Sequence, residues 1–196
     1  MAPKLILLCG PSGSGKTTIV QHLLKTYSNL SFSVSATTRS KRSNEINGKD
    51  YYFLTVEEFR KKIQADEFLE WEEVYTHGFY GTLRSEVDRI AAMGKVAIFD
   101  VDVEGGVHIK GRYGKNLLDV FVRPPSVEDL YKRLVARASE TPESLEKRIL
   151  KATHELTYAD RFNNVIINKD MHVAFAEAEN LVSAFLNDHE ELPVKK

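Results

Sequence analysis

The sequence predicts a single α/β domain with a mainly parallel core sheet, and three observations support this prediction. Its 196 residues suit one compact domain. Short apolar runs that fit buried strands alternate along the chain with segments of helical periodicity. A glycine-rich segment joins the first such run to the first helical segment. Strands that alternate with helices favour a parallel sheet covered by helices on both faces.

The first quarter of the chain predicts three strands and one helix. Residues 4–9 contain the continuous apolar run 5–9, which is typical of a strand buried on both faces. Apolar residues then recur at helical spacing over 19–27, which predicts the first helix. Residues 31–37 alternate between apolar and small hydroxyl side chains and predict one strand. A polar, turn-rich stretch follows, and a short strand is expected at 51–54.

The next segment predicts two helices and two strands. Thr55 and Glu58 form a capping box that begins a helix. Residues 68–75 are a strand candidate, and apolar residues at helical spacing over 83–94 predict a helix that ends at a glycine. The apolar run 96–101 predicts another buried strand.

The last third continues the alternation of strands and helices. Residues 117–122 predict a strand, which two prolines end, and Ser126 is expected to cap the helix that follows. Thr141 and a proline begin a further helix. A last strand is expected at 164–168 and a last helix at 174–185.

Composition argues against several classes of protein. Lys plus Arg (27) nearly balances Asp plus Glu (28), so no global positive field favours nucleic acid as a partner. The single cysteine, Cys9, cannot form an intrachain disulfide, which suits a reducing compartment. The apolar run around it is too short for a secretory signal, and no stretch approaches the ~20 apolar residues of a membrane span. We therefore expect a cytoplasmic protein without a membrane partner.

The strongest motif is GPSGSGKT at 10–17, which fits the phosphate-loop pattern G-x-x-x-x-G-K-[ST] between a strand and a helix. Backbone N–H groups and the helix N-terminus can hold phosphates there, with Lys16 on the β and γ phosphates and Thr17 on Mg²⁺. A chance glycine-rich turn is the alternative, at roughly one per cent or less. The motif therefore predicts a phosphoryl-transfer enzyme. The residues of this segment expected to bind ATP are Gly10, Pro11, Ser12, Gly13, Ser14, Gly15, Lys16, Thr17 and Thr18.

Two carboxylates, Asp100 and Asp102, end the predicted strand at 96–101 and share one face of it. The carboxyl edge of an open α/β sheet is where ligands bind. One carboxylate then suits Mg²⁺, with Asp100 and Thr17 as ligands either directly or through water, and the other suits a substrate. A pair of loop caps is the alternative, with roughly even odds for an acidic strand end without context. The neighbouring phosphate loop favours the functional interpretation.

Three groups of arginines are candidates for binding phosphate: Arg39 with Arg42, Arg133 with Arg137, and Arg148. The second pair lies four residues apart on one predicted helix, so both guanidinium groups could reach a phosphate chain. An exposed helical arginine is more often solvated or paired within its helix. Spacing alone leaves both interpretations open.

Seven segments together resemble the guanylate kinases nearly from end to end. They are GPSGSGKT at 10–17, SVSATTRSKR at 33–42, NGKDYYF at 47–53, EFLEW at 67–71, YG at 80–81, DVD at 100–102 and PPSVEDLYKRL at 124–134. The resemblance implies a three-layer P-loop kinase fold. Its core would comprise 1–32, 83–125 and 160–196, with an inserted mixed α/β GMP-binding subdomain at 33–82 and a helical lid at 126–159.

The resemblance also assigns roles to individual residues. Those that would face guanine are Ser35, Glu70, Thr82 and Asp102. Those that would hold the GMP phosphate are Arg39, Arg42, Tyr51 and Tyr80. The catalytic cations around the transferred phosphoryl would be Lys16, Arg133, Arg137 and Arg148, with Asn168 in the adenine pocket. Guanine offers adjacent N1–H and N2–H donors that one carboxylate accepts together, and adenine offers no such pair.

The implied reaction is ATP + GMP ⇌ ADP + GDP with Mg²⁺ and direct in-line transfer. Two alternatives stay open: a catalytically inactive binding module on the same scaffold, and a kinase of this fold with another acceptor. The chain departs from the family at Glu104, where Gln is common, and at Lys41, where Pro is common; Thr82 replaces a common Ser and keeps the hydroxyl. Oligomeric state, feedback regulation and the use of dGMP are not predicted.

Overall fold

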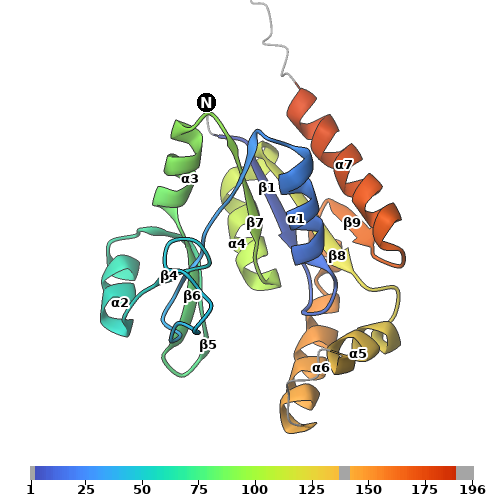
Figure 1. Ribbon diagram of the computed structural model, residues 1–196, viewed down its shortest axis with the longest axis horizontal. Helices are drawn as coiled ribbons and strands as arrows, with labels where there is room; N and C mark the ends of the chain where they lie inside the picture. Colours follow the sequence, from blue (N-terminus) through green and yellow to red (C-terminus); the bar gives the residue numbers. More distant parts are fainter. Residues whose placement is uncertain (1–2, 137–141, 189–196) are drawn as a thin grey trace, which may run out of the picture.

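A five-stranded sheet, parallel throughout, forms the centre of the computed structural model, which describes residues 3–136 and 142–188 (Figure 1). Its strands, in spatial order, are β2 (Leu30–Phe32), β7 (Val96–Asp100), β1 (Leu5–Cys9), β8 (Leu117–Arg123) and β9 (Asn164–Ile167). Every residue of β1 is buried, which is why this strand is a continuous apolar run. The predicted α/β fold with a parallel core sheet is confirmed.

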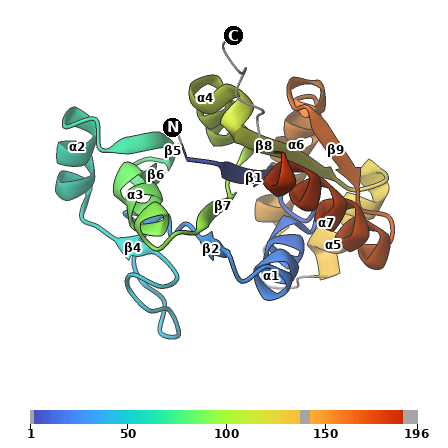
Figure 2. The same ribbon diagram turned by 90° about the horizontal axis from the view of Figure 1, so that it is seen from above.

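Helices cover both faces of this sheet. The helices α1 (Lys16–Thr26) and α7 (Met171–Asn187) pack with Ile6 and Leu8 of β1, whereas α3 (Arg84–Ala92) and α4 (Val103–Tyr113) pack on the side of Leu5 and Leu7. Figure 2 shows α4 on one side of the sheet and α1 with α7 on the other. The alternation of side chains along β1 therefore separates two cores.

A second, mixed sheet of four strands stands beside the first (Figure 1). Its strands, in spatial order, are β4 (Tyr52–Phe53), β3 (Ala36–Thr37), β6 (Gly78–Leu83) and β5 (Phe68–Tyr75). Phe59 of α2 (Val56–Gln64) packs against Phe68 and Phe79 of this sheet. The predicted capping box of α2 is confirmed, because the Thr55 hydroxyl accepts from the backbone N–H of Glu58 and the Glu58 carboxylate accepts in return.

The prediction of one strand over 31–37 is wrong. The chain leaves the first sheet after β2 and enters the second at β3, so the alternating segment is divided between two sheets. At the crossing, the backbone N–H of Ser33 still donates to Ile98, but that of Val34 donates to the buried carboxylate of Glu86 at 3.0 Å. A side chain that satisfies the backbone there allows the strand to end without an unpaired buried N–H.

Two further helices, α5 (Val127–Ala136) and α6 (Pro142–Leu156), follow β8 and pack through Leu130, Leu134 and Ala152. The predicted cap of α5 is confirmed, since the Ser126 hydroxyl accepts from the backbone N–H of Asp129 at 3.0 Å. The predicted start of α6 at Thr141 lies outside the described residues. Short 3₁₀ turns lie at Gly114–Asn116 and Ala159–Arg161. Among the helices that the structure describes, none has the length and apolar character needed to cross a membrane.

Candidate active site

The glycine-rich loop connects β1 to α1 and leaves the start of that helix open. Gly15 precedes the helix with a φ of 98°, in the left-handed region that favours glycine. A Cβ at this position would lie 2.3 Å from Nδ2 of Asn168, so a larger residue would also displace that side chain. No side chain caps α1, and its first N–H groups are available for an anion. The loop therefore has the geometry of a phosphate site.

Lys16, Thr17 and Asp100 meet beside this loop because β1 and β7 are neighbouring strands. Nζ of Lys16 donates to the carbonyl of Gly10 at 2.8 Å and lies 3.9 Å from Oδ1 of Asp100. The hydroxyl of Thr17 donates to Oδ2 of Asp100 at 2.5 Å. A hydroxyl and a carboxylate are the hard oxygen donors that suit Mg²⁺, which commonly takes its other ligands from substrate phosphates and water. Within 3–136 and 142–188, no cluster of three or more His, Cys, Asp or Glu could hold a metal alone.

Side chains from the C-terminal half contact the same loop. Nη2 of Arg148 donates to the hydroxyl of Ser12 at 2.8 Å, and Arg133 donates to the carbonyls of Ser14 at 3.4 Å and Asn168 at 2.7 Å. The buried amide of Asn168 donates to the carbonyl of Ser14 at 2.7 Å. Two of the predicted catalytic arginines and the predicted adenine-pocket residue therefore lie together at the loop. The third arginine, Arg137, lies outside the described residues.

A cavity of about 460 Å³ extends from the phosphate loop to the second sheet. The phosphate loop, the C-terminal end of β7 and the second sheet all contribute residues to the wall of this cavity. The residues that line it are Gly10, Ser12, Gly13, Gly15, Lys16, Thr17, Thr18, Ser35, Tyr51, Glu70, Glu72, Val74, Tyr80, Gly81, Asp100, Val101, Asp102, Arg148, Lys151 and Glu155. Ser35, Tyr51 and Tyr80, which the family resemblance assigns to GMP, thus line the same cavity as Lys16.

Glu70 and Thr82 form a hydrogen-bonded pair across β5 and β6, with the Thr82 hydroxyl donating to Oε1 of Glu70 at 2.6 Å. A Cβ on Gly105 would lie 2.8 Å from Oε2, so glycine at the start of α4 leaves room for the carboxylate. Burial raises the pKa of Glu70 to about 7, and the negative charge of Asp102 adds to this shift. Asp102 itself caps α4 by accepting from the backbone N–H of Gly105 at 2.9 Å.

Three charged residues on the cavity were not predicted: Glu72, Lys151 and Glu155. The neighbouring carboxylate of Asp102, together with burial, raises the pKa of Glu72 to about 8. Nζ of Lys151 lies 4.0 Å from Glu72 and 3.8 Å from Glu155. Sequence spacing gave signals for them, since Glu72 follows Glu70 by two along a strand and Lys151 follows Arg148 by three along a helix.

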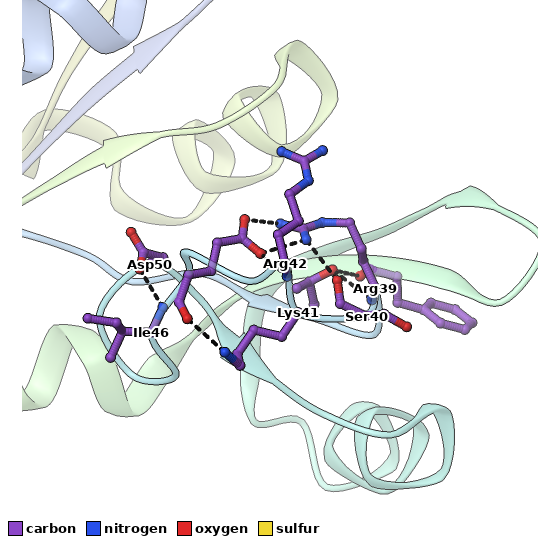
Figure 3. Close-up of polar contacts among 9 residues, drawn as sticks. Arg39, Ser40, Lys41, Arg42, Ile46 and Asp50 are labelled. Carbon is purple, nitrogen blue, oxygen red and sulfur yellow. Dashed lines mark hydrogen bonds and ion pairs between the residues drawn. The ribbon is translucent and has the colours of Figure 1, made fainter. Parts of the chain in front are cut away.

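The remaining predicted residues lie on the loop between β3 and β4 and at its edges (Figure 3). The Arg39 guanidinium stands 5.2 Å from the centre of the Tyr51 ring, which contacts the Tyr80 ring edge-on at 6.1 Å. The same guanidinium pairs with Glu45. The side chain of Arg42 is exposed. Tyr51 and Tyr80 thus line the cavity, and the Arg39 guanidinium contacts the Tyr51 ring from the adjoining loop.

Similarity to known proteins indicates the family of this chain. The family model for guanylate kinase matches residues 2–185. The guanylate kinase of Bacteroides fragilis is 49% identical over 93% of this chain and 90% of its own length, and that of Thermotoga maritima is 41% identical over 93% and 87%. The crystal structure of guanylate kinase from Anaplasma phagocytophilum superimposes with a TM-score of 0.74 at 27% identity, covering 93% of this chain and 85% of its own.

Because both the family model and several close relatives cover more than nine-tenths of the sequence, the chain belongs to the guanylate kinase family.

Proposed function

We propose that this chain carries out the guanylate kinase reaction, ATP + GMP ⇌ ADP + GDP, with ATP on the phosphate loop and GMP against the second sheet. The activity follows from its family, and the placement of the substrates is our proposal. The observation that supports the placement best is the Glu70–Thr82 pair, which lines the same cavity as Lys16. An ionised Glu70 can accept N1–H and N2–H of guanine together. Ser35 and Asp102 complete the proposed guanine site.

Charge and position account for the proposed catalysis. Lys16, Arg133 and Arg148 surround the phosphate loop, and we assign Arg137 to the same group. Their charges would offset the negative charge that develops on the transferred phosphoryl. The acceptor phosphate has a second pKa near 6, so it is already ionised at neutral pH and needs no general base. Exclusion of water by α5 and α6 would prevent hydrolysis of ATP in place of transfer.

A divalent cation, Mg²⁺, fits the oxygen donors beside the loop. Thr17 and Asp100 would hold it, directly or through water. When bound with ATP, Mg²⁺ neutralises charge on the β and γ phosphates. The neighbouring Nζ of Lys16, 3.9 Å from Asp100, keeps a positive charge beside the same oxygens.

Asp100→Asn is expected to raise the Mg²⁺ concentration for half-maximal rate by about tenfold or more, because an amide is a weaker ligand than a carboxylate. The measurement is the initial rate over a Mg²⁺ titration at fixed ATP and GMP. Glu104→Gln is the matched control, since it removes an exposed carboxylate near the same strand end without touching Thr17. Equal Mg²⁺ requirements in all three proteins would contradict the assignment.

The raised pKa of Glu70 predicts that KM for GMP depends on pH. Guanine requires the carboxylate, so protonation of the free protein below pH 7 weakens binding. KM for GMP should rise as pH falls from about 8 to about 6, approaching tenfold per pH unit below the pKa. Glu72 and the GMP phosphate also titrate, so Glu70→Gln is measured in parallel. An identical pH dependence in that variant would rule out Glu70 as its source.

The division of the chain follows from these assignments. We assign 33–82 to GMP binding and 126–159 to a lid, and the remaining segments, 1–32, 83–125 and 160–196, to the core. The cations around the phosphate loop argue against an inactive binding module, and the Glu70–Thr82 pair argues against a different acceptor. A cytoplasmic location, and the absence of nucleic acid and membrane partners, stay predictions.

Product analysis tests the proposed reaction directly. With Mg²⁺, ATP and GMP, the protein should release ADP and GDP in equal amounts, as followed by ion-exchange chromatography. ADP released without GDP, at the same rate with and without GMP, would identify an ATPase and refute the proposal.

A further inference from the structure

We propose that Glu45 is a positioning residue for the phosphate of GMP: its carboxylate holds the Arg39 guanidinium in the orientation that receives the phosphate. This inference rests on the proposed role of Arg39. It concerns a residue of the polar loop 38–51 that is not among the residues lining the cavity described above. The proposal is based on the contacts that Glu45 makes with two residues labelled in Figure 3, the guanidinium of Arg39 and the backbone of Arg42.

The first set of contacts is a two-pronged pair with Arg39. Oε1 of Glu45 accepts from Nη2 at 2.7 Å and Oε2 accepts from Nη1 at 2.8 Å. The side chains are 13% exposed for Glu45 and 23% exposed for Arg39, so solvent screens this pair less than an ordinary surface pair. The guanidinium also lies 5.2 Å from the Tyr51 ring and 5.5 Å from the Phe53 ring. These contacts therefore fix the orientation of the Arg39 guanidinium.

The second set of contacts attaches the same carboxylate to the loop backbone. Oε2 of Glu45 also accepts from the backbone N–H of Arg42 at 2.7 Å, and the Glu45 carbonyl accepts from Nζ of Lys41 at 2.9 Å. The hydrogen bonds from Arg39 and Arg42 lower the pKa of Glu45 to about 2, which keeps it ionised at neutral pH. The carboxylate therefore has an anchor that does not depend on Arg39, as expected of a support that stays in place when a ligand binds.

The guanidinium retains donors for a phosphate in this arrangement. Of the five N–H groups of an arginine, the contacts with Glu45 and with the Ser40 carbonyl involve three, two on Nη1 and one on Nη2. Tyr80, which lines the cavity, interacts with the same guanidinium. A guanidinium that is already oriented loses less side-chain entropy when it binds an anion, which favours binding. Glu45 would thus strengthen GMP binding although its charge is negative.

The test compares binding of GMP and of guanosine, which lacks the phosphate, to the full chain by titration calorimetry. Glu45→Gln keeps the size of the side chain but replaces one acceptor with a donor facing other donors. We expect it to weaken GMP binding about tenfold and to leave guanosine binding unchanged. In assays, KM for GMP should rise about tenfold, while kcat and KM for ATP stay near wild-type values. The matched control is Asp50→Asn, because Asp50 accepts the Ile46 N–H at 2.7 Å in the same loop but does not contact Arg39. It should change neither affinity.

Two outcomes with Glu45→Gln would overturn the inference. Equal weakening of GMP and guanosine would show that Glu45 only supports the fold of the loop, and tighter GMP binding would show that Glu45 competes with the phosphate. Arg39→Met separates this inference from the proposed function on which it rests. If Arg39→Met lowers GMP affinity and Glu45→Gln does not, Glu45 has no positioning role. If Arg39→Met leaves GMP affinity unchanged, the phosphate site itself is wrongly assigned.

Discussion

Replacing Lys16 with methionine is expected to lower kcat by about a thousandfold or more. Nζ of Lys16 donates to the Gly10 carbonyl, and the side chain is only 13% exposed, so the ammonium is already held over the loop before ATP binds. A preorganised cation acts on the developing charge without reorganisation, and loss of such a group commonly costs 10²–10⁵ in rate, about 3–7 kcal/mol. Single-turnover transfer from ATP to GMP measures the loss.

GMP affinity should survive this substitution, because the proposed GMP site lies on the second sheet. Lys25→Met provides the matched control, since it removes an exposed lysine from the last turn of the same helix. It should leave kcat unchanged. Near-normal turnover in Lys16→Met would show that the loop does not take part in catalysis.

Replacing Glu70 with glutamine is expected to lower kcat/KM for GMP by about 1–3 kcal/mol, a factor of about 5–150. The amide keeps the shape of the carboxylate but turns one acceptor into a donor that faces a donor of guanine. Thr82 would still hydrogen-bond the remaining oxygen, so the side chain should keep its place. AMP has no adjacent donor pair, and its already low kcat/KM should change much less.

Glu73→Gln is the matched control for this experiment, because Glu73 lies on the same strand but is absent from the cavity lining and accepts the His77 N–H at 2.7 Å. Both variants and the wild type are compared with GMP and with AMP at saturating Mg-ATP. Equal losses on the two acceptors in Glu70→Gln would show that Glu70 does not distinguish the bases.

Local patterns predicted the parts of the site that depend on near neighbours in sequence. The phosphate loop and the capping box at Thr55 are short motifs whose residues make their contacts within a few positions. The spacing of these residues therefore predicts their geometry. Asp100 is the last residue of β7, at the carboxyl end of the strand, as predicted. Spacing did not indicate the role of Glu70, which came only from the resemblance.

Contacts between distant segments could not be predicted in this way. Lys151 of α6 lies 4.0 Å from Glu72 of β5, and nothing in either segment alone indicates the other. The helix α4 was missed because its three glycines, Gly105, Gly106 and Gly111, have low helix propensity; burial of Val103 and Ile109 against the sheet compensates. The break between β2 and β3 was missed because it depends on a distant residue. The carboxylate that accepts the backbone N–H at the crossing belongs to Glu86, which lies about fifty positions away.

The most direct test of the account is the wild-type acceptor preference. Initial rates of ADP release at saturating Mg-ATP give kcat/KM for GMP, AMP, CMP and UMP. A site whose buried carboxylate is left unpaired by the wrong base typically discriminates by about 10⁴-fold, so GMP should exceed each of the others by at least a thousandfold. Comparable values for GMP and AMP, or a preference for another acceptor, would contradict the assignment of Glu70 and Thr82 to guanine.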